Sequence, residues 1–285
     1  MEEVHKQELL TAIRFHLNQV IELCLEENVL PEIKVHEIRK SFKRLNALLK
    51  LFPAELQAEV ILFRKPMRSI ARQLTSGRES TVNLQLFERL LLETQGLDEP
   101  KNEMLKEKLT QAKEESLLEL IEKEKILDDI LQLMNSGLKN LLPVLTETNY
   151  AVHIFDDILD TFFKSRHLYK PLTFNYNAEL YHELRKRMKT LWYQSELEAP
   201  GQTEVPGTIL EQLHTITDQL GDDHDWYIFL SDLKQEKYGL SDEGFNRLKS
   251  EVQQIQDATL KMLNQNLSEF FRLSEEQYLE LLRRL

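Results

Sequence analysis

Two separate sequence matches recur along this chain at one spacing. Residues 36–45 read HEIRKSFKRL and residues 182–191 read HELRKRMKTL, which places the second segment 146 residues after the first. A second pair, QLTSGRE at 73–79 and QLGDDHD at 219–225, has the same offset of 146 residues. Because two different matches rarely share one register by chance, the sequence predicts a duplicated structural unit.

The hydrophobic pattern predicts that this unit is helical, so the expected fold class is all-α. Apolar residues recur at spacings of three and four without sustained alternation, and glycine and proline number only eight each. An amphipathic helix cannot bury its apolar face alone, so we expect two pseudo-symmetric bundles of four or five helices, over residues 1–142 and 143–285. The helices are predicted near residues 3–27, 32–52, 54–75, 79–95, 99–140, 146–166, 177–197, 207–220, 223–237, 242–271 and 274–284.

The helix boundaries are predicted at residues that start or stop helices. Proline is tolerated in the first turn of a helix, and glycine is favoured just after the last turn. The predicted boundaries are helix starts at Pro31 and Pro53, caps or turns at Gly96, Gly221 and Ser241, and a loop over residues 198–207.

The charge of the chain is unevenly distributed. The net charge is −12, which by itself argues against a polyanionic partner. Residues 34–78 nevertheless carry +8 and residues 164–189 carry +5, so the rest of the chain carries −25. Two basic segments within an acidic protein indicate a localised anion-binding surface.

The first repeated motif places its basic residues on one helix face. At about 100 degrees per residue, the cations that share the face of His36 are Arg39, Lys40, Lys43 and Lys50. In the second copy the corresponding stripe is His182, Arg185, Lys186 and Lys189. Like charges three and four residues apart repel by tenths of a kcal/mol per pair. Since this arrangement occurs twice, we expect an anion to compensate it, either acidic residues of another helix or a bound polyanion.

At these residues the sequence resembles the CHAD family, the conserved histidine α-helical domain. The first motif of that family is a histidine followed at +3, +7, +8 and often +10 by arginine or lysine, and here Arg39, Lys43 and Arg44 follow His36. The second family motif is a leucine-glycine turn that ends in Arg-Asp or a similar pair. The corresponding pairs in this chain are Arg78-Glu79 and His224-Asp225.

The resemblance covers essentially the whole chain. It implies two helical bundles with a basic groove between them that binds inorganic polyphosphate, with no catalysis and no cofactor or metal. The positions that depart from the family pattern are Asn46 and Trp192 at +10, Thr190 at +8, and Thr75 in place of the first glycine. These departures predict weaker binding by the second half.

Polyphosphate carries about one negative charge per phosphate and no bases to read, so an array of cations suffices to bind it. Arginine gives bidentate contacts and lysine a point charge. A polyanion would also raise a histidine pKa that starts near 6.5, which predicts stronger binding below about pH 6.5. The residues predicted to bind polyphosphate are His36, Arg39, Lys40, Lys43, Arg44, Lys50, Arg68, Arg72, Arg78, Lys164, Arg166, Lys170, His182, Arg185, Lys186 and Lys189.

Other functions remain open at this point. The basic stripes could bind an acidic protein, which would make the chain a helical scaffold. A nucleic-acid interface is less consistent, because aromatic residues do not interleave with the cations. Asp156, Asp157 and Asp160 suggest a diphosphate enzyme, but a second aspartate motif of suitable spacing is missing. A metal-dependent phosphohydrolase would use His224 and Asp225 and needs further ligands.

The remaining features favour a soluble protein of the cytoplasm. The only cysteine, Cys24, lies among apolar residues and is expected to be buried. No apolar run approaches the roughly 18 residues of a membrane span, and the N-terminus is too polar for a signal peptide. We expect a cytoplasmic location, with polyphosphate granules as a further possible place of association.

Overall fold

The computed structural model describes residues 2–94, 100–120, 125–150, 153–198, 208–235 and 238–284. Within these ranges the chain is helical and forms no strand, which confirms the predicted all-α class. The α-helices are α1 (Glu2–Leu25), α2 (Pro31–Leu48), α3 (Gln57–Gln73), α4 (Thr75–Glu93), α5 (Pro100–Leu118), α6 (Ile126–Ser136), α7 (Leu142–Glu147), α8 (Ile154–Leu172), α9 (Ala178–Ser195), α10 (Ile209–Leu233), α11 (Asp242–Phe270) and α12 (Glu275–Arg283). Short 3₁₀ turns at Leu49–Leu51, Ala54–Leu56 and Glu196–Glu198 and a π-helical turn at Gly137–Leu141 join or extend them.

Several helix starts follow from the sequence. Pro31 occupies the first turn of α2, as predicted, and Ser241 caps α11 by accepting a hydrogen bond from the Gly244 N–H. The α9, α10 and α12 helices begin in the same way, at Asn177, Thr208 and Ser274. The predicted cap at Gly96 lies outside the described residues, as does most of the predicted loop 198–207.

The single helix predicted over residues 99–140 is wrong. The α5 helix ends at Leu118 and α6 begins at Ile126, just after Lys125 takes a left-handed backbone conformation (φ 46°). The first part of α5 and the whole of α6 bury their apolar residues in different places, since Leu105 of α5 packs beside α10 and α11 and Ile130 of α6 packs in the larger core, which only the end of α5 reaches, at Leu117. Helix propensity alone favoured continuity, and tertiary packing overrides it.

Two other predicted boundaries are also wrong. We predicted a break near Gly221, but α10 runs unbroken from Ile209 to Leu233. The helix predicted over residues 146–166 is also interrupted near its start, because α7 ends at Glu147 and α8 begins at Ile154. Glycine lowers helix stability by about 0.5–1 kcal/mol, a cost that the buried side chains on both sides of Gly221 offset.

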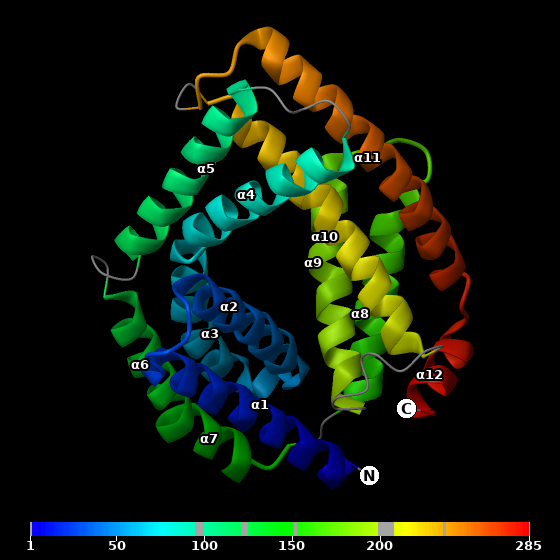
Figure 1. Cartoon of the computed structure of the whole chain (residues 1–285). Coiled ribbons are helices and arrows are strands. Elements are labelled where there is room, and N and C mark those ends of the chain that lie inside the picture. Colours follow the sequence, from blue (N-terminus) through cyan, green and yellow to red (C-terminus); the bar gives the residue numbers. More distant parts are fainter. Residues whose placement is uncertain are drawn as a thin grey trace.

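The apolar side chains form two clusters of unequal size. The larger core gathers buried residues of α1, α2, α3, α6, α7, α8, α9 and α12, with the end of α5, the first half of α10 and the end of α11. The smaller core joins α4 and α5 to the second half of α10 and the first half of α11. Figure 1 shows α4 and α10 crossing near the centre, with α5 and α11 on either side of them. Helices α5, α10 and α11 contribute to both clusters and so connect them.

Four helices meet where the basic stripes lie. The α2 helix packs against α9 and α4, and α10 packs against α9 and α4. Figure 1 shows these four helices in the middle of the molecule. No helix among the described residues is long and apolar enough to cross a membrane.

Candidate functional site

The two repeated helices, α2 and α9, turn their apolar faces into the core and their basic faces toward each other. On α2, Ile38 and Leu45 are fully buried, and on α9 Leu184 and Met188 are fully buried. With 3.6 residues per turn, the arginines and lysines between these apolar positions fall on the opposite face of each helix. We call the residues that meet there the central cation cluster, which consists of Arg39, Lys43, Arg78, Arg185 and Lys189.

Burial and the positive charges of the central cation cluster lower the pKa values of its two lysines. Burial lowers the pKa of Lys43 to about 6, and the next contributions come from the charges of Lys189, Arg185, Arg39 and Arg78. Burial also lowers the pKa of Lys189 to about 8, with Arg185 as the next cause. Desolvation and like charges both disfavour a charged ammonium group. Both lysines are therefore harder to protonate in the folded protein than in water, and the neighbouring positive charges add to the effect of burial.

Hydrogen bonds and ion pairs hold the arginines in place. The Arg39 guanidinium donates to the carbonyl oxygen of Ala71 at 2.5 Å and to Thr75 Oγ1 at 2.9 Å. Asp225 Oδ2 lies 3.0 Å from an Arg78 nitrogen, and Asp225 Oδ1 lies 4.0 Å from an Arg185 nitrogen. The Nε groups of Arg39 and Arg185 are nevertheless buried without a hydrogen-bond partner in the described part of the chain. The arginines are thus preorganised but retain unused donors.

The carboxylates around the cluster are fewer than its cations. Among the described residues, those that act on the cluster are Asp225, Asp218 next to Lys189, and Glu79 next to Arg39. Burial raises the pKa of Glu79, which weakens its contribution as a counterion. When all are protonated, the five cations of the cluster therefore outnumber the three carboxylates that act on them.

The two histidines that begin the stripes have different surroundings. The side chain of His36 is 59% exposed, and its Nε2 lies 3.8 Å from Glu37 Oε1. His182 Nδ1 instead lies 3.2 Å from Nδ1 of His224, where the first copy has Arg78. Burial, followed by nearby cations, lowers the pKa of His182, and burial also lowers that of His36. Both imidazoles are therefore predominantly neutral at pH 7.

A second basic group lies at the far end of the α2 stripe. Burial lowers the pKa of Lys50 to about 8, and the charges that add to this effect are Arg64, Arg68, Arg187 and Lys164. The Lys50 ammonium donates to Thr190 Oγ1 at 3.3 Å. Lys50, Lys164 and Arg187 line a pocket of ≈ 220 Å³ together with Asp157 and Asp160. Arg64 and Arg187 lie within the basic segments 34–78 and 164–189 but were not among the residues predicted to bind polyphosphate.

Other predicted site residues lie apart from these two groups. Arg44 forms a bidentate ion pair with Glu196, at 3.0 and 3.1 Å, and lies over the Tyr193 ring. Lys40 and Lys186 point outward and pair with the neighbouring glutamates of their own helices. The remaining predicted residues, which are exposed or half-buried on α3 and α8 outside the central cation cluster, are Arg72, Arg166 and Lys170.

The aspartates considered for catalysis are divided between helices. Asp156, Asp157 and Asp160 lie on α8, and Asp225 of α10 is engaged by Arg78. Among the described residues no group of three histidine, cysteine, aspartate or glutamate side chains is placed to hold a metal ion. Cys24 is buried, as expected.

Fold and site together define an all-helical protein with a partly buried cationic centre. The family model described as CHAD domain matches residues 11–233, so the chain belongs to the CHAD domain family. This confirms the resemblance seen in the motifs. Among solved structures, PptA from Streptomyces chartreusis is similar, with a TM-score of 0.66 over 94% of this chain and 99% of that chain, at 12% sequence identity. At this identity the similarity concerns the fold. No curated protein matches the sequence.

Proposed function

We propose that this protein binds inorganic polyphosphate without transforming it, through the central cation cluster. One observation carries the proposal: cations from α2, α4 and α9 face one another at partly buried positions with too few carboxylates to neutralise them. Such an arrangement destabilises the free protein and is relieved when a polyanion supplies negative charge. Membership of the CHAD domain family supports the same ligand.

The chemistry of the side chains fits a chain of phosphates. The guanidinium groups of Arg39 and Arg185 each have a buried Nε–H without a hydrogen-bond partner in the described part of the chain, and arginine binds phosphate oxygens in pairs where its donors are accessible. Lys43 and Lys189 provide ammonium groups whose protonation a bound anion would favour. The pocket at Lys50 offers a second place for phosphates further along the same chain. Binding is proposed to be non-catalytic because the cluster consists of positioned cations, with its nearest carboxylate, Asp225, paired to Arg78.

The histidines have a secondary role in this proposal. His36 lies at the exposed end of the α2 stripe, and His182 lies beside His224. A bound polyanion would raise the pKa of each imidazole, so that both become cationic in the complex. Association with polyphosphate would also place the protein where that polymer accumulates, including cytoplasmic granules.

A thermal-shift titration tests the proposal. Long-chain polyphosphate and orthophosphate are compared at equal total phosphate. A ligand at about 100 times its Kd stabilises by about 2.7 kcal/mol, which corresponds to a rise in Tm of about 5 °C or more for a chain of this size. We expect that rise with polyphosphate and a much smaller one with orthophosphate.

Two double variants test whether polyphosphate binds at the cluster. Lys43→Met with Lys189→Met should abolish most of the polyphosphate response. Lys65→Met with Lys249→Met removes the same charge from two exposed positions and should preserve it. Equal responses to polyphosphate and orthophosphate would overturn the proposal. A Tm that ignores polyphosphate but rises with an acidic protein partner would favour the scaffold function instead.

A further inference from the structure

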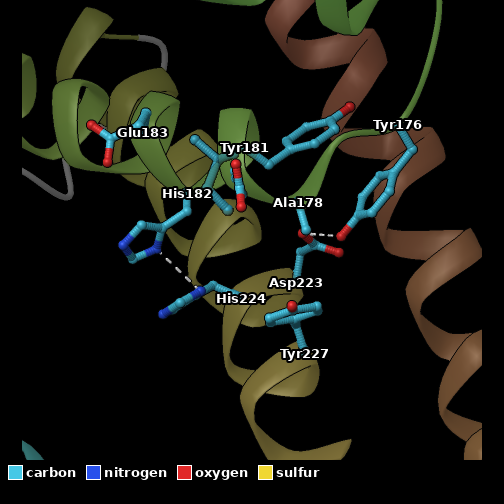
Figure 2. A pocket seen from close by; sticks show the side chains of 10 residues that line it. Tyr176, Ala178, Tyr181, His182, Glu183, Asp223, His224 and Tyr227 are labelled. Carbon is cyan, nitrogen blue, oxygen red and sulfur yellow. Dashed lines mark hydrogen bonds between the residues drawn. The ribbon is translucent and has the colours of Figure 1, made fainter. Parts of the chain in front are cut away.

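A different cavity, of ≈ 380 Å³, lies between the first turns of α9 and the middle of α10. Figure 2 shows it, with Tyr176 from the segment before α9 on one side and His182 and His224 on the other. None of the described residues that line this cavity is a lysine or an arginine. Its chemistry therefore differs from that of the neighbouring cation cluster, and we call it the tyrosine pocket.

The tyrosine pocket contains a buried carboxylate without a cationic partner. Asp223 is 3% exposed, and in Figure 2 it lies between Tyr176 and Tyr227. Its oxygens accept hydrogen bonds from the Tyr176 hydroxyl and the Gln256 amide, each at 3.3 Å. Both donors are neutral, and among the described residues Asp223 forms no ion pair within 4.0 Å. A buried anion with such weak compensation is costly unless a ligand supplies a positive charge.

Aromatic rings surround this carboxylate. The rings of Tyr176 and Tyr181 are stacked with centroids 5.2 Å apart, and Tyr227 lines the pocket below Asp223 (Figure 2). Tyr176 and Tyr227 are each about half exposed to solvent, so their rings are accessible to a ligand. Tyrosine faces attract organic cations through the ring quadrupole within about 6 Å of the centroid.

The other titratable groups of the pocket leave it negative. Glu179 and Glu183 lie at its edge with exposed side chains, and Glu183 is paired with Lys186 at 2.7 Å. Burial lowers the pKa of His224 to about 4, and burial also lowers that of His182, so both imidazoles are predominantly neutral at pH 7. Burial raises the pKa of Asp223 to about 6, which still leaves most of this carboxyl ionised above pH 7.

We propose that the tyrosine pocket binds a small organic ammonium ion, with Asp223 as its counterion and the rings of Tyr176 and Tyr227 against its alkyl groups. The volume is in the range of about 300–1,000 Å³ that small-molecule sites occupy, which is far more than a bare ion needs. A carboxylate combined with tyrosine rings favours an organic cation over an inorganic one. The site is separate from the polyphosphate proposal and does not depend on it.

Isothermal titration calorimetry at pH 7.5 tests this inference with three probes at equal ionic strength. Putrescine presents a primary ammonium, choline presents a quaternary ammonium, and potassium chloride is the inorganic control. We expect saturable binding of putrescine, choline or both, and none of potassium. The comparison between the two organic probes identifies the ammonium class. Absence of binding by both, or equal heats with potassium, would overturn the inference.

Two variants locate the binding. Asp223→Asn preserves the shape of the side chain and should lower the affinity for the organic ammonium ion at least tenfold. Tyr227→Ala, at a half-exposed position, should also weaken it, whereas Tyr227→Phe should retain it because the ring remains. If Asp223→Asn does not fold, the Tyr227 pair carries the test.

The matched control is Asp222→Asn, which removes the adjacent negative charge. Asp222 pairs with Arg89 at 3.2 Å and does not line the pocket. Its replacement should leave ammonium binding unchanged. An equal loss in Asp222→Asn and Asp223→Asn would show that only the general charge of the protein attracts the ligand, which contradicts the site.

Discussion

Replacing Lys43 by methionine should stabilise the free protein. Lys43 is surrounded by like charges, and its pKa falls from 10.5 to about 6 in the folded state. At pH 7 the folded lysine must give up a proton that the unfolded chain keeps. At about 1.36 kcal/mol per pH unit below 10.5, this costs at most about 5 kcal/mol. Side-chain movement toward water reduces the cost, and replacement of buried charges by apolar residues gains about 1–4 kcal/mol, which is the range that we expect.

The stability gained by Lys43→Met should depend on pH. Because the folded pKa lies below the unfolded one, the unfolded state binds more protons, and wild-type stability rises with pH between about 6 and 10.5. The advantage of Lys43→Met should therefore be larger at pH 7 than at pH 9. Urea denaturation followed by circular dichroism at both pH values measures it, with Lys65→Met as the exposed control. A variant that loses stability at pH 7 with an unchanged m-value, or an advantage that does not shrink at pH 9, would refute the reasoning.

Three further outcomes follow from the same geometry. Polyphosphate affinity should rise as pH falls from 9 to 6, because Lys189 and then Lys43, with pKa values of about 8 and about 6, become charged; a flat profile in anisotropy titrations would contradict this. Arg44→Gln should cost about 1–3 kcal/mol of stability, because it removes the ion pair with Glu196, yet weaken polyphosphate binding less than Lys43→Met does; urea denaturation and binding titrations separate the two effects. Gly221→Ala should preserve binding, since a new Cβ meets Arg185 at an ordinary 3.9 Å, whereas Gly221→Leu should displace that guanidinium and lower the affinity several-fold.

Much of the fold was predictable because periodicity identifies which face of a helix is buried. The burial of Ile38 and Leu184 behind the basic stripes is an example. Periodicity does not identify the partner helix. The break before Ile126 and the continuity of α10 at Gly221 both depend on contacts between distant segments, which single-sequence patterns do not contain. The duplication suggested by the offset of 146 residues, and the two repeats drawn from it, stay predictions.

For the candidate site, the sequence predicted which cations share a helix face but not which of them form ion pairs. Arg39 and Lys43 were expected on one stripe and Arg185 and Lys189 on the other, and, after burial, the charges of the other three residues lower the pKa of Lys43. That these residues bind polyphosphate stays a prediction. The motif could not distinguish Arg44, which pairs with a glutamate 152 residues away. The motif also could not show that Asp225 reaches across to Arg78. Ion pairs between helices that are remote in sequence determine which basic side chains remain for an anionic ligand. These pairs can be seen only in the structure.

The central claim is that polyphosphate binds at the cation cluster. Its most direct test is the salt dependence of labelled polyphosphate binding, measured by fluorescence anisotropy between about 50 and 200 mM salt. The slope of log K against log salt becomes shallower by about 0.7–0.9 for each phosphate that the protein no longer neutralises. We expect a steep wild-type slope, a slope shallower by about 1–2 with weaker binding in Lys43→Met/Lys189→Met, and the wild-type slope in Lys65→Met/Lys249→Met. An unchanged slope and affinity in the Lys43→Met/Lys189→Met protein would contradict the claim.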